Sequence, residues 1–385
     1  MKKVAILGST GSIGVNTLEV IRRDRQSFSL TGLAAGNNIE LLRRQIGEFS
    51  PKRVAVAGSG PAEKLRQSVG GSVEVLEGEE GMAALASDPE ADLVVVAVPG
   101  TAALLPALAA IERGKDLALA SKEILVAAGE LTMTAAAESG SRILPVDSEH
   151  SAVFQCLRGL DSREVKRIIL TASGGPFLEA SREELASVTP EAALDHPRWK
   201  MGKKVSLDSA TMMNKGLEVL EAHWLFGVPL DRIEVIIHPQ SVIHSLVETA
   251  DGSLLAQLSL PDMRLPISYA LYYPGRSPRA YRETVLSELE GLTFRRPDRR
   301  LFPALDLAFR AGREGGTMPA VMNAANEAAG EAFLAGEIPF LKIMEVVEAV
   351  MDGHRVVADP DLAAILEAAR RARARAEEII GGGER

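Results

Sequence analysis

Residues 4–14 read Val-Ala-Ile-Leu-Gly-Ser-Thr-Gly-Ser-Ile-Gly, and this stretch decides the fold of the N-terminal part of the chain. Its leading apolar residues suit a strand that is buried on both faces. The glycines predict a tight turn, and the spacing of Leu18, Val20 and Ile21 predicts a helix after it. This is the context in which a dinucleotide pyrophosphate binds at a helix N-terminus. A plain strand-to-helix turn is the alternative, but the position of the turn and the βα pattern that follows favour nucleotide binding.

Short apolar segments and helical segments alternate as far as residue 146. This alternation predicts a mainly parallel sheet with helices on both faces, so we expect residues 1–146 to form a doubly wound, Rossmann-like α/β domain. Ligands of such sheets bind at the carboxyl ends of the strands, and Lys122 and Asp147 each directly follow a strand. The strands are expected at Phe28–Ala34, Arg53–Ala57, Asp92–Val98, Leu117–Ala120 and Ile143–Val146, with a helix at Ala102–Arg113.

The end of the second expected strand bears on the choice of cofactor. It reads Ala35-Gly36-Asn37-Asn38, without the acidic residue that usually binds the ribose hydroxyl of NAD. This argues against NAD and permits a 2′-phosphate. Arg43 and Arg44 lie nearby, either as partners of that phosphate or as solvated helix residues.

Residues 206–218 combine hydroxyls, an amide, an ammonium and two carboxylates between apolar flanks. Neutral donors and one cation suit a phosphate dianion. On a helix, Glu218 would share a face with Asn214, which would put a carboxylate suited to a metal beside the phosphate. The alternative is a helix start capped by Asp208 or Ser209, with Asn214 and Lys215 in solvent.

Two carboxylates lie close together in Asp147-Ser148-Glu149. Close carboxylates suit a hard divalent cation such as Mg²⁺ or Mn²⁺. A capped helix N-terminus explains the same residues, and both interpretations can hold at once.

Two further segments suit an anion. The turn Ser173-Gly174-Gly175 offers a hydroxyl and backbone N–H groups, although a plain turn is the alternative. Residues 196–203 combine a proline, a tryptophan, a glycine and several cations, including Lys200. This composition suits a loop that closes over an anion, and an ordinary surface loop is the alternative.

The second half of the chain is expected to contain three more parts. Residues 147–273 should form a catalytic α/β domain with a mixed or antiparallel sheet, in which Ile233–Ile237, Val242–Glu248 and Leu254–Leu260 are antiparallel strands whose edges need covering. Residues 274–300 read as a linker, and residues 301–385 as a C-terminal helical bundle. Its helices are expected at Leu301–Arg310, Met318–Ala335, Phe340–Met351 and Leu362–Ile380.

Composition limits the class of protein. The chain has 385 residues, a net charge of −9 and one cysteine, Cys156. The negative charge argues against a nucleic-acid-binding surface, and no apolar run reaches membrane-spanning length. A single cysteine and the lack of a signal peptide predict a cytoplasmic protein. We therefore expect a cytoplasmic protein whose partners include neither nucleic acid nor membrane.

Taken together, these motifs closely resemble the family of 1-deoxy-D-xylulose 5-phosphate reductoisomerases, and the resemblance runs through essentially the whole chain in the same order. The block around Asn214 and Lys215 is the most specific. The matching motifs are residues 8–14, Ser121-Lys122-Glu123, Pro145–His150, Ser173–Phe177, His196-Pro197-x-Trp199-x-Met201-Gly202, Asp208–Glu218, His238–His244 and Asn323–Glu327.

The resemblance implies a homodimer that uses NADPH and a divalent cation (Mg²⁺, Mn²⁺ or Co²⁺). Such enzymes convert 1-deoxy-D-xylulose 5-phosphate into 2-C-methyl-D-erythritol 4-phosphate for isoprenoid precursors. The carbon skeleton rearranges first, and the resulting aldehyde is reduced by hydride. A metal-independent NADP-dependent dehydrogenase and a non-catalytic nucleotide sensor are the alternatives, but neither needs a phosphate clamp beside three carboxylates.

Carried over by position, the resemblance implies that Asp147, Glu149 and Glu218 bind the metal and that Lys122 acts with them in catalysis. Lys122 and Ser148 would also contact the oxygen functions of the substrate. Trp199 and Met201 would lie on the closing loop. The substrate phosphate would be held by Ser173, His196, Ser209, Asn214 and Lys215. Cofactor contacts would come from Thr10, Gly11, Ser12, Ile13, Gly36, Asn37, Asn38, Ser121, Glu123 and Gly202.

Two positions depart from the family pattern. Many relatives carry Lys or Arg where this chain has Asn37, so a cation is missing from the expected 2′-phosphate site. Many also carry Asn where this chain has Ser121, whose hydroxyl keeps the capacity to hydrogen-bond.

Overall fold

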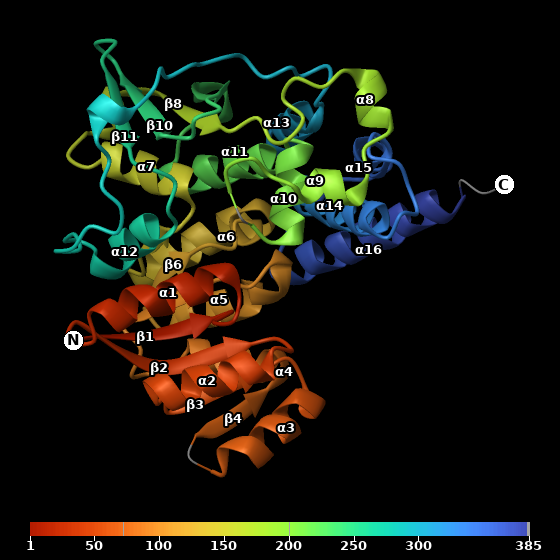
Figure 1. Cartoon of the computed structure of the whole chain (residues 1–385). Coiled ribbons are helices and arrows are strands. Elements are labelled where there is room, and N and C mark those ends of the chain that lie inside the picture. The colour runs from red at the N-terminus through yellow and green to blue at the C-terminus, as the bar shows by residue number, and fades with distance from the viewer. Residues whose placement is uncertain (72, 200, 383–385) are drawn as a thin grey trace. The chain divides into compact units, whose positions relative to one another are not determined.

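The computed structural model describes residues 1–71, 73–199 and 201–382, which form two compact units (Figure 1). The first unit contains Met1–Ile124, Thr132–Ser151 and Asp262–Arg282. The second contains Leu125–Leu131, Ala152–Pro261 and the described residues from Glu283 onward. Within the described ranges, no helix is both long and apolar enough to cross a membrane. The four-part division expected from the sequence stays a prediction.

The first unit is built on a seven-stranded sheet in which every pair of neighbouring strands is parallel. The strand order β4-β3-β2-β1-β5-β6-β7 reverses direction at β1, which confirms the doubly wound fold. Ligands of such sheets bind at this reversal, outside the carboxyl ends of the strands. The strands are β1 (Lys2–Leu7), β2 (Phe28–Ala35), β3 (Arg53–Val56), β4 (Glu74–Glu77), β5 (Leu93–Val96), β6 (Asp116–Leu119) and β7 (Ile143–Pro145).

Helices connect these strands and cover the sheet. The strands β1 and β5 are buried, as expected for central strands of a parallel sheet. The helices are α1 (Ser12–Arg23), α2 (Ile39–Phe49), α3 (Ser59–Val69), α4 (Gly78–Ala86), α5 (Leu104–Glu112), α6 (Glu123–Ser139), α7 (Ser148–Cys156) and α12 (Arg264–Tyr272), of which α6 and α7 also contribute residues to the second unit.

Helix α12 was not predicted, and it packs against α1 although the two are far apart in sequence. Arg264 pairs with Glu19 of α1 at 2.6 Å. The Tyr272 hydroxyl donates to the Asp24 carboxylate at 2.6 Å, which lowers the pKa of Asp24. The segment that includes α12 therefore belongs to the first unit.

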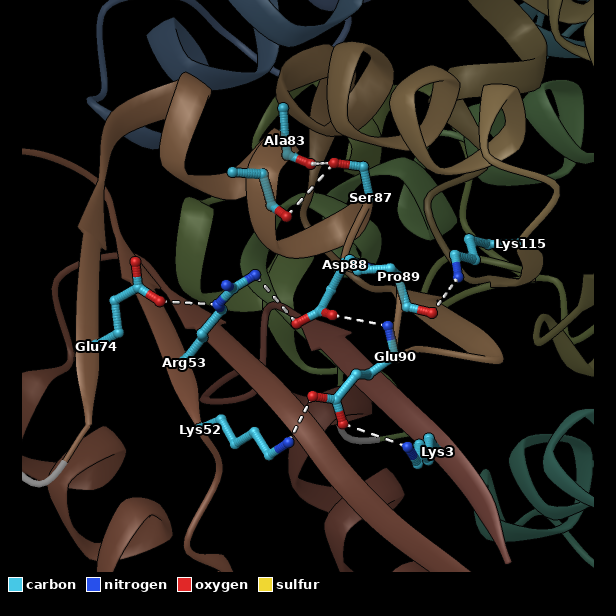
Figure 2. A network of polar contacts seen from close by, with 11 residues as sticks. Lys3, Lys52, Arg53, Glu74, Ala83, Ser87, Asp88, Pro89, Glu90 and Lys115 are labelled. Carbon is cyan, nitrogen blue, oxygen red and sulfur yellow. Dashed lines mark hydrogen bonds and ion pairs between the residues drawn. The ribbon is translucent and has the colours of Figure 1, made fainter.

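The amino-terminal edge of the first sheet carries a polar network (Figure 2). Arg53 pairs with Glu74 at 2.8 Å and with the buried Asp88 at 3.4 Å. Glu90 pairs with Lys52 at 2.5 Å and with Lys3 at 3.3 Å. Exposed pairs of this kind contribute little individually. They join neighbouring strands at the edge opposite the glycine-rich turn, so this edge is structural.

The second unit contains a four-stranded mixed sheet with the order β11-β10-β8-β9. As predicted, β10 (Ile243–Thr249) and β11 (Leu254–Leu258) are antiparallel. The prediction that Ile233–Ile237 is also antiparallel was wrong, because this strand, β9, pairs in parallel with β8 (Val165–Ala172). Parallel neighbours need a long crossover, and the helices between residues 182 and 226 supply it.

The predicted C-terminal helical bundle is confirmed. Its longest helices pack side by side, and they share one hydrophobic core with the second sheet. Helix α13 packs against α11, and α14 packs against α10, so the bundle reaches the segment that holds the predicted phosphate site. The helices of the second unit are α8 (Arg182–Ala186), α9 (Pro190–Leu194), α10 (Lys203–Ala210), α11 (Met213–Phe226), α13 (Ala304–Glu314), α14 (Met318–Leu334), α15 (Lys342–Asp352) and α16 (Leu362–Gly381).

Candidate active site

The carboxyl-terminal edge of the first sheet contains a cavity of about 600 Å³. Thr10, Gly11 and Gly36, three of the predicted cofactor residues, line it. The rest of its wall is mainly small and apolar, which suits the face of a nucleobase. Glu79, at the start of α4, also lines the cavity, although no sequence motif indicated this residue.

Two glycines of the first turn are required by its geometry. Gly8 has φ +88°, and a Cβ there would lie 2.2 Å from the carbonyl oxygen of Ala97. A Cβ on Gly14 would lie 2.3 Å from the carbonyl oxygen of Gly8. Gly11 is the N-cap of α1 and offers no side chain there. The turn therefore presents backbone N–H groups at a helix N-terminus, which is an anion site.

The loop after β2 contains the residues on which the predicted preference for NADPH over NADH depends. Gly36, Asn37 and Asn38 are exposed. The Asn38 side chain accepts a hydrogen bond from the backbone N–H of Leu41 at 3.2 Å and caps α2. Asn38 is thus oriented by its capping role, whereas Gly36 leaves the cavity open.

The residues that follow β6 and β7 meet at the same edge of the sheet, as predicted. The Lys122 ammonium lies 2.5 Å from the Asp147 carboxylate, and their side chains are 9% and 15% exposed. The neighbouring Ser121 hydroxyl donates to the carbonyl oxygen of Val98 at 2.6 Å. An ion pair so shielded from water holds both side chains in position beyond the carboxyl ends of β6 and β7.

Helix α7 begins directly after Asp147. The Ser148 hydroxyl donates to the Glu149 carboxylate at 2.6 Å. His150, which is fully buried, has a ring nitrogen within 4.8 Å of an Asp147 carboxylate oxygen. No role was predicted for His150, although its position three residues after Asp147, at the start of a helix, is a pattern that could have suggested one. Glu123 lies buried at the start of α6.

In the second unit, residues 203–226 form two helices rather than one helix start. Helix α10 ends at Ala210, and α11 begins after Met212, whose backbone is left-handed with φ +66°. Asp208 and Ser209 lie inside α10, so neither caps α11, and the capping alternative is wrong.

The first turns of α11 hold a buried polar cluster. The Asn214 amide donates to the Glu218 carboxylate at 2.6 Å, and the Lys215 ammonium contacts the other oxygen of that carboxylate. Lys215 is 4% exposed and Glu218 is 1% exposed. Burying two charges is costly unless they are paired, so this arrangement points to a functional role and not to a solvated helix face.

The glycine turn after β8 packs against α10. Gly174 and Gly175 both have positive φ, and a Cβ on Gly175 would lie 2.6 Å from the carbonyl oxygen of Ser209. The Ser173 hydroxyl lies 2.9 Å from Nε2 of His196. Ser173 thus lies against His196, and the turn that follows Ser173 lies against the backbone of Ser209. The role of these residues in holding a phosphate stays a prediction.

His196 also orders the loop that follows it. Its Nδ1 accepts backbone hydrogen bonds from Trp199 at 2.9 Å and from Arg198 at 3.2 Å. A ring nitrogen that accepts carries no proton, so Nε2 carries the proton and donates to Ser173. Burial lowers the pKa of His196, which favours this neutral form.

The loop continues along β10 and into α10. The rings of Trp199 and His244 lie 6.3 Å apart between centroids, and Arg198 donates to the carbonyl oxygen of Pro239 at 3.2 Å. Met201 is half-buried, and Gly202 is the N-cap of α10. Lys200 lies outside the described residues. The closing role of this loop stays a prediction.

The donor chemistry in both units fits a hard divalent cation. Asp147 and Glu149 in the first unit and Glu218 in the second offer carboxylate oxygens, the ligand type that Mg²⁺ and Mn²⁺ prefer. Asp147 and Glu218 are each next to an ammonium, Lys122 and Lys215 respectively, which balances the carboxylate charge.

Family models match most of the chain. Residues 4–129 match the model described as 1-deoxy-D-xylulose 5-phosphate reductoisomerase, residues 143–226 match its C-terminal domain, and residues 258–375 match the DXP reductoisomerase C-terminal domain.

Full-length relatives and solved structures agree with this. The 1-deoxy-D-xylulose 5-phosphate reductoisomerase of Pelotomaculum thermopropionicum is 56% identical over 382 residues, covering 99% of both chains. That of Citrifermentans bemidjiense is 53% identical and covers 100% of both chains. The Zymomonas mobilis enzyme in complex with NADPH has a TM-score of 0.92 at 43% identity, covering 98% of this chain and 99% of that one. A DOX-P reductoisomerase in complex with NADPH, fosmidomycin and magnesium has a TM-score of 0.95 at 40% identity, covering 99% and 98%.

These relatives extend over the whole chain. The motifs that suggested the family include Ser173, which contacts His196, and Asn214, which contacts Glu218. The chain therefore belongs to the family of 1-deoxy-D-xylulose 5-phosphate reductoisomerases.

Proposed function

We propose that the chain converts 1-deoxy-D-xylulose 5-phosphate into 2-C-methyl-D-erythritol 4-phosphate, with NADPH as reductant and a divalent cation, on the route to isoprenoid precursors. The observation that carries this proposal is the buried cluster of Asn214, Lys215 and Glu218. An enzyme of this family needs a cation to bind the substrate phosphate and a carboxylate to bind the metal, and this cluster supplies both. The single cysteine, Cys156, supports a cytoplasmic location.

The substrate phosphate is assigned to the second unit. Ser173, Ser209 and Asn214 supply neutral donors, and Lys215 supplies the charge-assisted contact. His196 in its neutral form donates a hydrogen bond through Nε2–H, so a phosphate oxygen can accept that hydrogen bond as readily as the Ser173 hydroxyl does. The phosphate is remote from the reacting carbons, so its binding energy is available to order the loop at Trp199 and to orient the substrate.

The metal is assigned to Asp147, Glu149 and Glu218, which the sequence resemblance groups together. When bound, a divalent cation would polarise the substrate carbonyl and stabilise negative charge on its oxygen. Lys122 keeps the Asp147 carboxylate in position and provides a donor for a substrate oxygen. Ser148 orients Glu149 and offers its hydroxyl to the same end of the substrate.

NADPH is assigned to the cavity of the first unit. The turn around Gly11 would take the pyrophosphate, and the small residues of the wall would take the adenine. Ser12, Ile13, Ser121, Glu123 and Gly202 stay predicted cofactor contacts. The exposed Asn37 and Asn38 contain no carboxylate to repel a 2′-phosphate, so NADPH should have a higher kcat/KM than NADH. Equal values for the two cofactors would refute this preference.

A homodimer is part of the proposal. Strand β11 lies at the edge of the second sheet, and its Leu254 and Leu255 side chains are 56% and 39% exposed. Leu258 on the same strand is 36% exposed. An exposed apolar edge strand tends to associate with another chain, and a second copy of this chain would cover it. Light scattering that gives a monomer at micromolar concentration would contradict the dimer.

The direct test follows the absorbance of NADPH with 1-deoxy-D-xylulose 5-phosphate as substrate. We expect NADPH loss that needs both the substrate and Mg²⁺ or Mn²⁺. Turnover that is unchanged by a chelator would favour a metal-independent dehydrogenase. NADPH binding without any oxidation, in the presence of metal and substrate, would favour a nucleotide-sensing protein.

A further inference from the structure

Asp208 lies within the phosphate-site segment, yet the reaction proposed above gives its carboxylate no contact with substrate or metal. It sits on α10 and is 5% exposed. One of its oxygens accepts a hydrogen bond from the Asn326 amide at 2.7 Å, and the other lies 2.9 Å from the Lys204 ammonium. A buried carboxylate is costly without such partners, so the position of Asp208 depends on them.

Asn326 belongs to α14 of the C-terminal bundle and is 2% exposed. It lies 118 residues away from Asp208 in sequence. Its side-chain amide is therefore a tertiary contact between the bundle and the helix that carries Ser209, and it is made between two groups that water does not reach.

Close packing fixes the same two elements. A Cβ on Gly330, one turn after Asn326 on α14, would lie 3.2 Å from Cδ2 of Leu207 on α10. A Cβ on Gly216 of α11 would lie 2.8 Å from Cβ of Ala308 on α13. Both helices of the phosphate site thus rest on bundle helices with little space between them. Apolar packing of this kind sets distances, whereas a hydrogen bond also sets rotation.

We propose that Asn326 and Asp208 are positioning residues for the substrate phosphate, through which the C-terminal bundle sets the orientation of α10. Ser209 is next to Asp208 on α10. Only Thr211 and the left-handed Met212 separate the end of α10 from the start of α11, so a rotation of α10 moves Ser209 and the start of α11 together. This inference rests on the proposed phosphate site, and it assigns a positioning role to Asn326 of the Asn323–Glu327 motif, to which the proposed reaction gives no role.

A matched control lies on the same helix. Asn323 is also an asparagine of α14 and is 1% exposed, but its amide donates to Glu327 within that helix, at 3.1 Å. Glu327 also lies 3.9 Å from the Lys204 ammonium of α10. The Asn323 amide donates to Glu327 and not to Asp208, so Asn323→Ala should lower stability while the hydrogen bond between Asn326 and Asp208 stays in place. Asn326→Ala should raise both the KM for 1-deoxy-D-xylulose 5-phosphate and the inhibition constant of inorganic phosphate by about tenfold, since a small misplacement of binding groups weakens substrate positioning. NADPH affinity should stay unchanged in both variants.

A double exchange tests the hydrogen bond itself. Asp208→Asn combined with Asn326→Asp reverses donor and acceptor and keeps one charge at the site. We expect it to bring the KM and the phosphate inhibition constant back to within about threefold of the unmodified protein, since the packing and the total charge stay the same and the amide oxygen of the new asparagine can still accept from Lys204. If Asn326→Ala does not fold, this double variant alone decides between the two outcomes.

Equal KM values for Asn323→Ala and Asn326→Ala would overturn the inference, and so would a folded double exchange variant with a tenfold higher KM. Both results presuppose that the unmodified protein turns over the substrate. If the unmodified protein shows no turnover, the proposed function itself fails, and the two failures are thereby told apart.

Discussion

The cofactor turn of the first unit and the phosphate cluster of the second both suit anions, but they are built in different ways. The turn at residues 8–14 uses backbone N–H groups, and its glycines are required because a Cβ would collide with a carbonyl oxygen. The cluster on α11 uses charged side chains that are almost completely buried. Substitutions that add bulk should therefore weaken anion binding at the turn, whereas substitutions that remove a charge or a hydrogen bond should weaken it at the cluster.

The largest effect is expected at the carboxylates assigned to the metal. Asp147→Asn and Glu218→Gln should each fold, still bind NADPH, and lose roughly 10²–10³-fold or more in kcat, because transition-state charge would no longer be stabilised as well. Steady-state assays and NADPH titration measure the two properties separately. A chelator should inactivate the unmodified protein, and Mg²⁺ or Mn²⁺ should restore it.

A conservative change at an exposed carboxylate provides the control. Glu130→Gln lies on α6 at an exposed position and should leave kcat unchanged. Full activity of Asp147→Asn and Glu218→Gln in excess chelator would remove the metal assignment.

The next largest effect is expected on NADPH affinity, when a close-packed glycine of the turn is replaced and an exposed glycine serves as the comparison. Gly14→Ala should weaken NADPH binding by about 5–150-fold, because its Cβ would meet the backbone of Gly8 and Ser9 and relieving that overlap costs about 1–3 kcal/mol. Gly47→Ala is the matched control, because Gly47 lies exposed on α2, does not line the cavity, and a Cβ there would meet no atom within 4 Å. Titration of both variants with NADPH measures the difference, and equal dissociation constants would contradict a close-packed turn.

Lys215→Ala tests the charged site. Loss of a hydrogen bond to a charged group should lower kcat/KM for the phosphorylated substrate by about 1.5–3 kcal/mol, or roughly 10–150-fold. NADPH affinity should not change, because the cofactor cavity belongs to the first unit. Lys342→Ala, which removes an exposed ammonium from α15 in the same unit, separates phosphate contact from general loss of positive charge. An unaltered kcat/KM in Lys215→Ala would exclude it from the phosphate site.

The features that could be predicted from the sequence are those that depend on neighbouring residues, and the features that were missed depend on contacts between distant segments. The parallel sheet and the glycine turn depend on local patterns, such as the apolar run before Gly8, and both were predicted. The parallel pairing of β9 was not, because a strand's partner depends on the crossover that precedes it. Helix α12 was missed for a similar reason, since the partners that hold it, such as Glu19, lie on α1.

The site shows the same limit. Residue types alone indicated Asn214, Lys215 and Glu218, and the helix placed them together as expected. The partner of Asp208 could not be read from any spacing, because Asn326 lies on a different helix. Sequence spacing reveals contacts within an element, whereas contacts between elements require the fold.

The smallest effect concerns pH and the loop at Trp199. Burial lowers the pKa of His196, so the folded protein favours the neutral ring, whose Nδ1 accepts from the backbone of Trp199. As pH falls below the ordinary histidine value of about 6.5, the unfolded chain binds a proton that the folded chain resists. The contribution of His196 to stability is therefore present above that pH and decreases as pH falls toward the lowered value. His196→Gln removes this dependence, so the difference in unfolding free energy between the two proteins should narrow on acidification. A difference that stays constant from neutral to acidic pH, measured by denaturant titration, would show that the neutral ring does not hold the loop.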